Sequence, residues 1–130
     1  MNDRYLFRAK RIDDGKWIIG NLIDSPDGKN AIAETSAGWL IYDVDPSTIC
    51  QCTGLKDKNG KLIWENDIVK PFADLKGIVR FGERDYSREF GFNIEWISKP
   101  YYRRDFLYWA EKCKVIGSAI DNPELLEQEG

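Results

Sequence analysis

The side chains of this 130-residue chain that could do chemistry are its carboxylates, three cysteines and one basic aromatic segment, because the sequence contains no histidine. Without an imidazole, mechanisms that use a histidine base or a His-ligated metal are excluded. The sequence also lacks the motifs of phosphate-binding loops, dinucleotide folds and serine-hydrolase elbows. We therefore expect a non-enzymatic protein that uses no metal and no cofactor.

The cysteines are Cys50, Cys52 and Cys113. A zinc site needs about four ligands, and the chain cannot complete that set with histidine. In a strand, Cys50 and Cys52 would share one face, where small apolar side chains pack well. The odd cysteine count and an N-terminus without an apolar signal region predict buried, reduced thiols in the cytoplasm.

The carboxylates offer two weaker hypotheses. Glu65 and Asp67 could act as an acid pair of the glycosidase type, but nothing in the sequence separates their pKa values. Residues 57–61 resemble part of a calcium loop, yet placing Gly60 at its sixth position puts Leu55 first, where it cannot ligate the ion. A turn with a solvated charged rim is the simpler interpretation.

A basic aromatic segment, with Tyr101, Tyr102, Arg103 and Arg104, is the best nucleic-acid candidate. Tyrosines can stack on bases while arginines neutralise phosphates. Three further arginines could extend such a face: Arg80, Arg84 and Arg88.

Charge favours the opposite interpretation of this segment, with its aromatics in the core and its arginines paired with Asp85, Glu89 or Asp105. The net charge is −3, and the acidic residues of the last ten positions (Asp121, Glu124, Glu127 and Glu129) leave the rest of the chain nearly neutral. A neutral body does not imply nucleic-acid or membrane binding.

The elements that would position these residues are mainly strands. Residues 90–96 alternate apolar and smaller or polar side chains, and residues 67–70 and 77–81 are short β-branched runs, so a small antiparallel meander is predicted. Residues 5–12 and 17–23 flank a four-residue hairpin connection, and residues 38–43 predict another strand. Residues 103–112 fit neither a helix nor a strand cleanly.

A short C-terminal helix is predicted at residues 122–126, where Asn122 can cap and Pro123 takes the first helical position. No repeat or linker divides the chain, so we expect one domain over residues 1–130.

The most distinctive segment is residues 53–70, and it resembles the hallmark of the YopX family, small proteins encoded by bacteriophages and prophages. The hallmark residues are Thr53, Gly54, Leu55, Asp57, Asn59, Gly60, Ile63, Trp64, Glu65, Asp67, Ile68 and Val69. Further family marks occur at residues 7–9, 115–117 and 122–126. Asn66 departs from the usual Gly but tolerates positive φ, and residues 118–120 also depart from the family pattern.

The resemblance implies a predominantly β fold, a small antiparallel barrel or pseudo-barrel with an SH3-like part, and no large helical layer. It supplies no catalytic residues and no activity. We interpret the hallmark as structural: Asn59 and Gly60 form a turn, Asp57 caps its amides, and Asp67 accepts amide hydrogens at a strand entry. Leu55, Ile63 and Trp64 are expected to pack beneath the turn.

The leading hypothesis is a phage-encoded accessory protein that binds a partner, most simply a protein, in the host cytoplasm. Aromatic patches and edge strands also favour a homo-oligomer. A nucleic-acid-binding small β barrel is the alternative, and a carboxylate enzyme is less favoured.

If the hallmark turn holds the fold, replacing Asn59 and Gly60 together by alanine should lower the melting temperature well beyond a surface change. The left-handed conformation alone costs an L-residue about 1–2 kcal/mol. Thermal unfolding followed by circular dichroism measures this, and an unchanged melting temperature would contradict the structural role.

Overall fold

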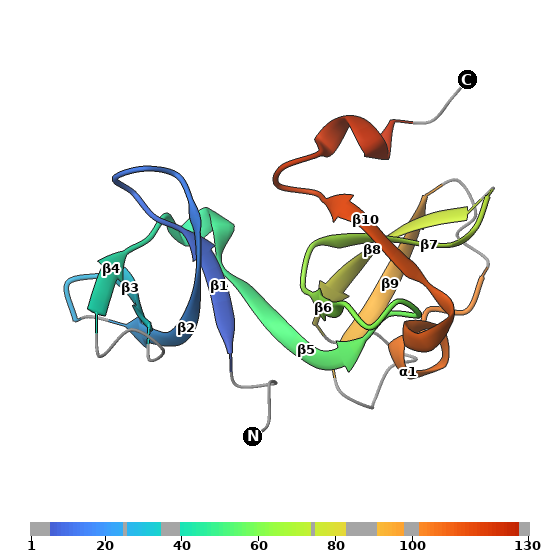
Figure 1. Cartoon of the computed structure of the whole chain (residues 1–130), viewed down its shortest axis with the longest axis horizontal. Coiled ribbons are helices and arrows are strands. Elements are labelled where there is room, and N and C mark those ends of the chain that lie inside the picture. The colour runs from blue at the N-terminus through green and yellow to red at the C-terminus, as the bar shows by residue number, and fades with distance from the viewer. Residues whose placement is uncertain are drawn as a thin grey trace. The chain divides into compact units, whose positions relative to one another are not determined.

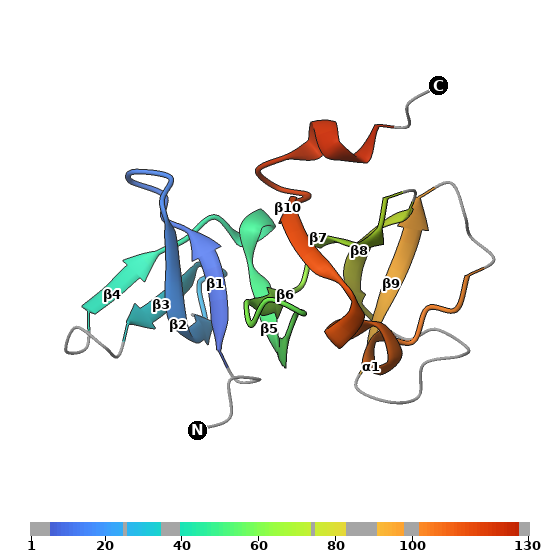
Figure 2. The same cartoon turned by 45° about the vertical axis from the view of Figure 1, so that its right-hand side comes forward.

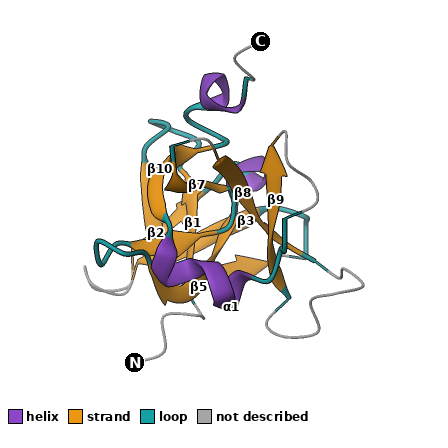
Figure 3. Cartoon of the chain, turned by 90° about the vertical axis from the view of Figure 1, so that its right-hand side faces the viewer, coloured by secondary structure: helices purple, strands orange, loops and turns teal. Residues whose placement is uncertain are grey.

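The computed structural model describes residues 6–24, 26–34, 40–73, 75–82, 91–97 and 102–127. Strands dominate these residues and helical segments are short (Figure 3). The mainly β fold is therefore confirmed. The strands are β1 (Phe7–Lys10), β2 (Trp17–Asp24), β3 (Asn30–Glu34), β4 (Leu40–Asp43), β5 (Cys50–Lys56), β6 (Leu62–Trp64), β7 (Asp67–Phe72), β8 (Leu75–Phe81), β9 (Phe92–Ile97) and β10 (Lys114–Ser118).

The chain divides into two compact units, residues 1–54 and residues 55–130, and the chain passes from one to the other within β5. One antiparallel sheet has the order β4-β3-β2-β1-β5-β6, and the other has the order β10-β7-β8-β9 (Figure 1). A single domain over residues 1–130 stays a prediction.

The first unit contains the predicted hairpin, in which β1 pairs with β2 across residues 11–16. Alternation explains its core, because Ala9 and Ile18 are Cα partners in this ladder and are both buried. Ile32 and Val44 complete a small apolar cluster with them.

The second unit contains the predicted meander, since β7 pairs with β8 and β8 with β9, all antiparallel (Figure 2). In β9 the apolar side chains Phe92, Ile94 and Trp96 are buried, as their spacing predicts. They join a core formed mainly by β7, β8 and the short helix α1 (Phe106–Trp109).

A barrel or pseudo-barrel was predicted, and the described strands form two antiparallel sheets with no closed barrel among them. In the first unit β1 pairs with β2 on one side and with β5 on the other. Only an isolated bridge between Arg11 and Val44 then joins the end of β1 to the chain beyond β4. Closure would need a continuous ladder between the edge strands.

The ambiguous residues 103–112 form α1 followed by a 3-10 turn at Ala110–Lys112. The predicted C-terminal helix is a 3-10 turn at Pro123–Leu126, with Pro123 in its first turn. Asn122 does not cap it through its side chain; its Oδ1 instead accepts the Ser118 amide at 3.2 Å. Within the described ranges, no helix is long and apolar enough to span a membrane.

Asn66 adopts a φ of 71°, the positive value expected where the family usually has glycine. Its backbone joins two elements, because its N–H donates to Val79 O at 2.7 Å and its carbonyl accepts the Ala119 amide at 2.8 Å. The turn between β6 and β7 therefore depends on a residue that tolerates the left-handed region.

We predict that Asn66→Gly is more stable than Asn66→Ala by about 1 kcal/mol, because alanine is strained at positive φ. Both variants lose the Arg80 contact to Asn66 Oδ1, which measures 2.9 Å. The difference between their free energies of unfolding therefore reports the backbone strain at this position. Urea unfolding of the two proteins gives this difference. Equal stabilities would mean that the backbone conformation is not the constraint.

Candidate functional site

The hallmark turn is organised by one buried carboxylate, that of Asp57. Its Oδ1 accepts the backbone amides of Asn59 at 2.8 Å and Lys61 at 2.9 Å. Its Oδ2 accepts the amide of Val115, at 2.9 Å, from the distant strand β10. The predicted cap is confirmed, and the bond to β10 is an addition that the sequence did not reveal.

The three amides also control the ionisation of Asp57. Burial raises the pKa of the carboxyl, but the hydrogen bonds donated to its charged form outweigh burial and hold the pKa below its ordinary value. In the turn itself, Gly60 has a φ of 83° while Asn59 stays outside the positive region. Of these two turn residues, only Gly60 therefore adopts the left-handed backbone conformation.

The remaining hallmark residues also have structural positions: they bond the backbone, pack in the core or form turns. Asp67 is buried and its Oδ2 accepts the Trp64 amide at 2.8 Å, as predicted for a strand entry. Ile63 lies in the core of the second unit, and Leu55 packs against that core. Gly54 has a φ of 80°, which favours glycine. The other buried members are Thr53, Trp64, Ile68 and Val69, while Glu65 is half-buried.

A shallow pocket of about 290 Å³ lies beside this turn. Its lining residues are Leu55, Lys56, Asp57, Leu107, Ala110 and Glu111. The acid pair proposed from sequence, Glu65 and Asp67, is not part of this lining, and the Asp57 oxygens already accept three amides.

The three cysteines are buried and free, as predicted for core thiols. Burial raises the pKa of Cys113 to about 12, so its thiol stays protonated at neutral pH. In the part of the chain that the structure describes, no three or more Cys, Asp and Glu side chains gather in a way that could hold a metal ion.

The basic aromatic segment is largely engaged within the fold. Tyr102 packs against the core and meets Trp96 edge-on, with ring centroids 6.5 Å apart. Arg103 pairs with Asp105 at 2.7 Å, as the alternative interpretation proposed. Arg104 donates to Asn93 Oδ1 at 2.9 Å. The candidate residues Tyr101, Arg84 and Arg88, and the acids Asp85 and Glu89, lie outside the described residues.

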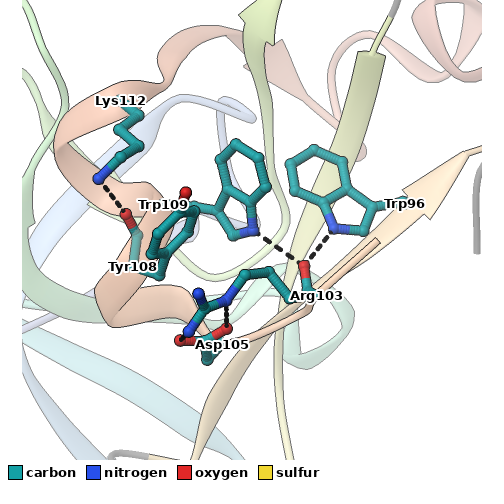
Figure 4. Close-up of polar contacts among 6 residues, drawn as sticks. All are labelled: Trp96, Arg103, Asp105, Tyr108, Trp109 and Lys112. Carbon is teal, nitrogen blue, oxygen red and sulfur yellow. Dashed lines mark hydrogen bonds and ion pairs between the residues drawn. The ribbon is translucent and has the colours of Figure 1, made fainter. Parts of the chain in front are cut away.

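The aromatic core contains a junction that the sequence did not predict (Figure 4). The indole N–H groups of Trp96 and Trp109 both donate to the backbone carbonyl of Arg103, at 2.7 and 2.8 Å. Their rings pack edge-on with centroids 5.0 Å apart. The guanidinium of Arg103 lies 3.9 Å from the ring centroid of Tyr108. The surplus of aromatics was the only signal in the sequence for this junction.

The first unit presents a different surface, which we call the apolar edge: Ile12, Asp13, Ile41, Tyr42 and Asp43. These residues line a shallow pocket of about 290 Å³. Ile12 and Ile41 are 66% and 62% exposed, unusually high for isoleucine. The pocket lies at β4, an edge strand of its sheet. Sequence analysis placed strands here but could not show which apolar side chains stay outside.

Fold and site together define a mainly β protein of two antiparallel sheets with a carboxylate-capped hairpin between β5 and β6. The chain matches the YopX protein family over residues 6–127. It belongs to the YopX family, which confirms the resemblance. No curated protein matches the chain.

We predict that Asp57→Asn lowers stability at pH 7, because an amide cannot accept all three N–H bonds and carries no charge. The folded-state pKa of Asp57 is depressed, so its contribution is present above the unfolded value of about 3.9 and is lost as pH falls through the folded value.

Urea midpoints of both proteins between neutral pH and about pH 3 test this. The difference in free energy of unfolding between the unaltered chain and Asp57→Asn should be about 1–3 kcal/mol at pH 7. It should become smaller as the pH falls. A gap that stays constant with pH would show that the charge of Asp57 does not contribute to stability.

Proposed function

We propose that this YopX protein is a phage- or prophage-encoded accessory protein that acts without catalysis, by binding a protein partner in the host cytoplasm. The observation that carries the proposal is the apolar edge of the first unit. Two strongly exposed isoleucines flank a pocket there, at an edge strand. Exposed apolar groups gathered around a concavity are typical of protein interaction sites.

The chemistry of the apolar edge suggests what the partner presents. Ile12, Ile41 and Tyr42 offer apolar area, while Asp13 and Asp43 add carboxylates to the lining. Asp13 is paired with Arg11 at 3.0 Å, which leaves Asp43 as the better acceptor for a partner's cation. We expect a segment that combines an apolar anchor with a flanking Lys or Arg.

A second copy of this chain is one candidate partner, because an edge strand can pair with its own symmetry mate. Size-exclusion chromatography with light scattering tests this. A monomer at high concentration would mean that the apolar edge binds a different protein and not a second copy of this chain. An SH3-like arrangement of part of the fold stays part of the proposal.

We predict that the double variant Ile12→Lys/Ile41→Lys loses the partner. Each buried isoleucine contributes about 1.5–3 kcal/mol, so the affinity should fall at least tenfold. Folding stability should change little, because both side chains are exposed in the isolated chain.

Affinity capture from lysogenic cells, followed by titration with the purified partner, measures the loss. Phe72→Lys is the matched control, because Phe72 is an exposed apolar residue of the second unit, 48% accessible. If the unaltered chain, the double variant and Phe72→Lys all retain the same partner, the interface lies elsewhere.

A further inference from the structure

Five lysines gather around the hallmark turn of the second unit, and we call them the lysine surface. Two lie on the turn, two lie on either side of Cys113, and one lies on β7: Lys58, Lys61, Lys112, Lys114 and Lys70. Lys58, Lys61, Lys112 and Lys114 are exposed and Lys70 is half-buried. Lys70 and Lys112 are 42 positions apart in sequence, so the fold brings the two halves of this set together.

Backbone contacts fix this arrangement. The Lys58 amide donates to Cys113 O at 3.0 Å, which places the turn beside the segment that carries Lys112 and Lys114. Lys114 is the direct partner of Lys70 in the β10–β7 ladder. The next pair, Val115 and Val69, belongs to the core side, so the two lysines point to the opposite, solvent-facing side.

The lysine surface carries an excess of positive charge, because its five lysines outnumber the two carboxylates beside them. The carboxylates on the described turn and on the segment before β10 are Asp57 and Glu111. Asp57 is buried and its oxygens accept three backbone amides, although its charge also interacts with that of Lys61, and Glu111 is exposed. Like charges directly opposed in a ladder, as Lys70 and Lys114 are, destabilise the sheet. A bound anion would relieve this repulsion.

We propose that the lysine surface binds the phosphate backbone of nucleic acid without reading its bases. Lysine is a compact point charge that binds phosphate oxygens without imposing the two-bonded geometry of the arginine fork, so it suits contacts to a backbone that read no bases. The surface consists of lysines throughout. A duplex presents about one charge per 1.7 Å of axis, and release of its condensed counterions rewards clustered cations.

This surface differs from the basic aromatic segment that the sequence suggested. Arg103 and Arg104 are held by Asp105 and Asn93. Lys112 marks the margin of the lysine surface, where its Nζ donates to Tyr108 O at 3.0 Å and lies 4.3 Å from the Tyr108 ring centroid (Figure 4).

Fluorescence anisotropy with labelled single- and double-stranded DNA of about 20 nucleotides, at about 50 and 200 mM salt, tests the proposal. The full chain should bind at low salt and weaken on the order of a hundredfold at the higher salt. Lys70→Gln/Lys114→Gln should weaken binding roughly tenfold and reduce the logarithmic salt slope by about 1–2.

Lys16→Gln/Lys29→Gln is the matched control, because it removes the same charge from exposed positions of the first unit. It should bind as the unaltered chain does.

Removing a like-charge pair should leave the melting temperature of Lys70→Gln/Lys114→Gln at or above that of the unaltered chain. If that variant fails to fold, Lys58→Gln/Lys61→Gln replaces it with the same expected loss.

Three results would overturn the proposal. The first is no binding to either DNA at low salt. The second is an equal loss in the lysine-surface variant and its control, which would indicate only net charge. The third is competition by polyglutamate as effective as unlabelled DNA at equal charge concentration, which would assign the surface to an acidic protein.

Discussion

The carboxylate of Asp57 is the interaction on which the second unit depends. One oxygen closes the hallmark turn and the other accepts the amide of Val115, 58 positions further along the chain. This bond sets where β10 begins relative to the turn. The adjacent bond from the Lys58 amide to Cys113 O continues the same junction. The core beneath it includes Ile63, Val69 and Cys113.

The buried carboxylates of the hallmark accept backbone amides. The surfaces proposed for binding therefore consist of other side chains. Asp57 and Asp67 both accept amides while buried, so a ligand at either carboxylate would have to compete with these backbone hydrogen bonds. Two exposed features of the described residues support the proposals. The first unit offers apolar side chains at an edge strand, and the second offers lysines around the capped turn.

Much of the local structure could be predicted from residue pattern. The alternation in residues 90–96 predicted the buried face of β9, and asparagine's tolerance of positive φ predicted the backbone of Asn66. The pattern could not decide between a barrel and a pseudo-barrel, and the described residues form no closed barrel, because closure depends on which edges meet and not on strand periodicity. Residues 103–112 could not be assigned because Trp109 is also placed by packing against Trp96 of β9, which the pattern of the segment itself does not encode.

The sequence by itself determined the turn residues, the strand periodicity, the exclusion of histidine chemistry and the resemblance to the YopX family, since each of these depends on residue type or short-range spacing. Only the tertiary structure decided that Asp57 reaches β10, that two indoles share one carbonyl, and that Lys70 opposes Lys114. Two of these contacts join residues 58 and 44 positions apart, and the indole junction brings together Trp96 of β9 and Trp109 of α1. Their register is set by strand pairing and core packing, which no local pattern encodes.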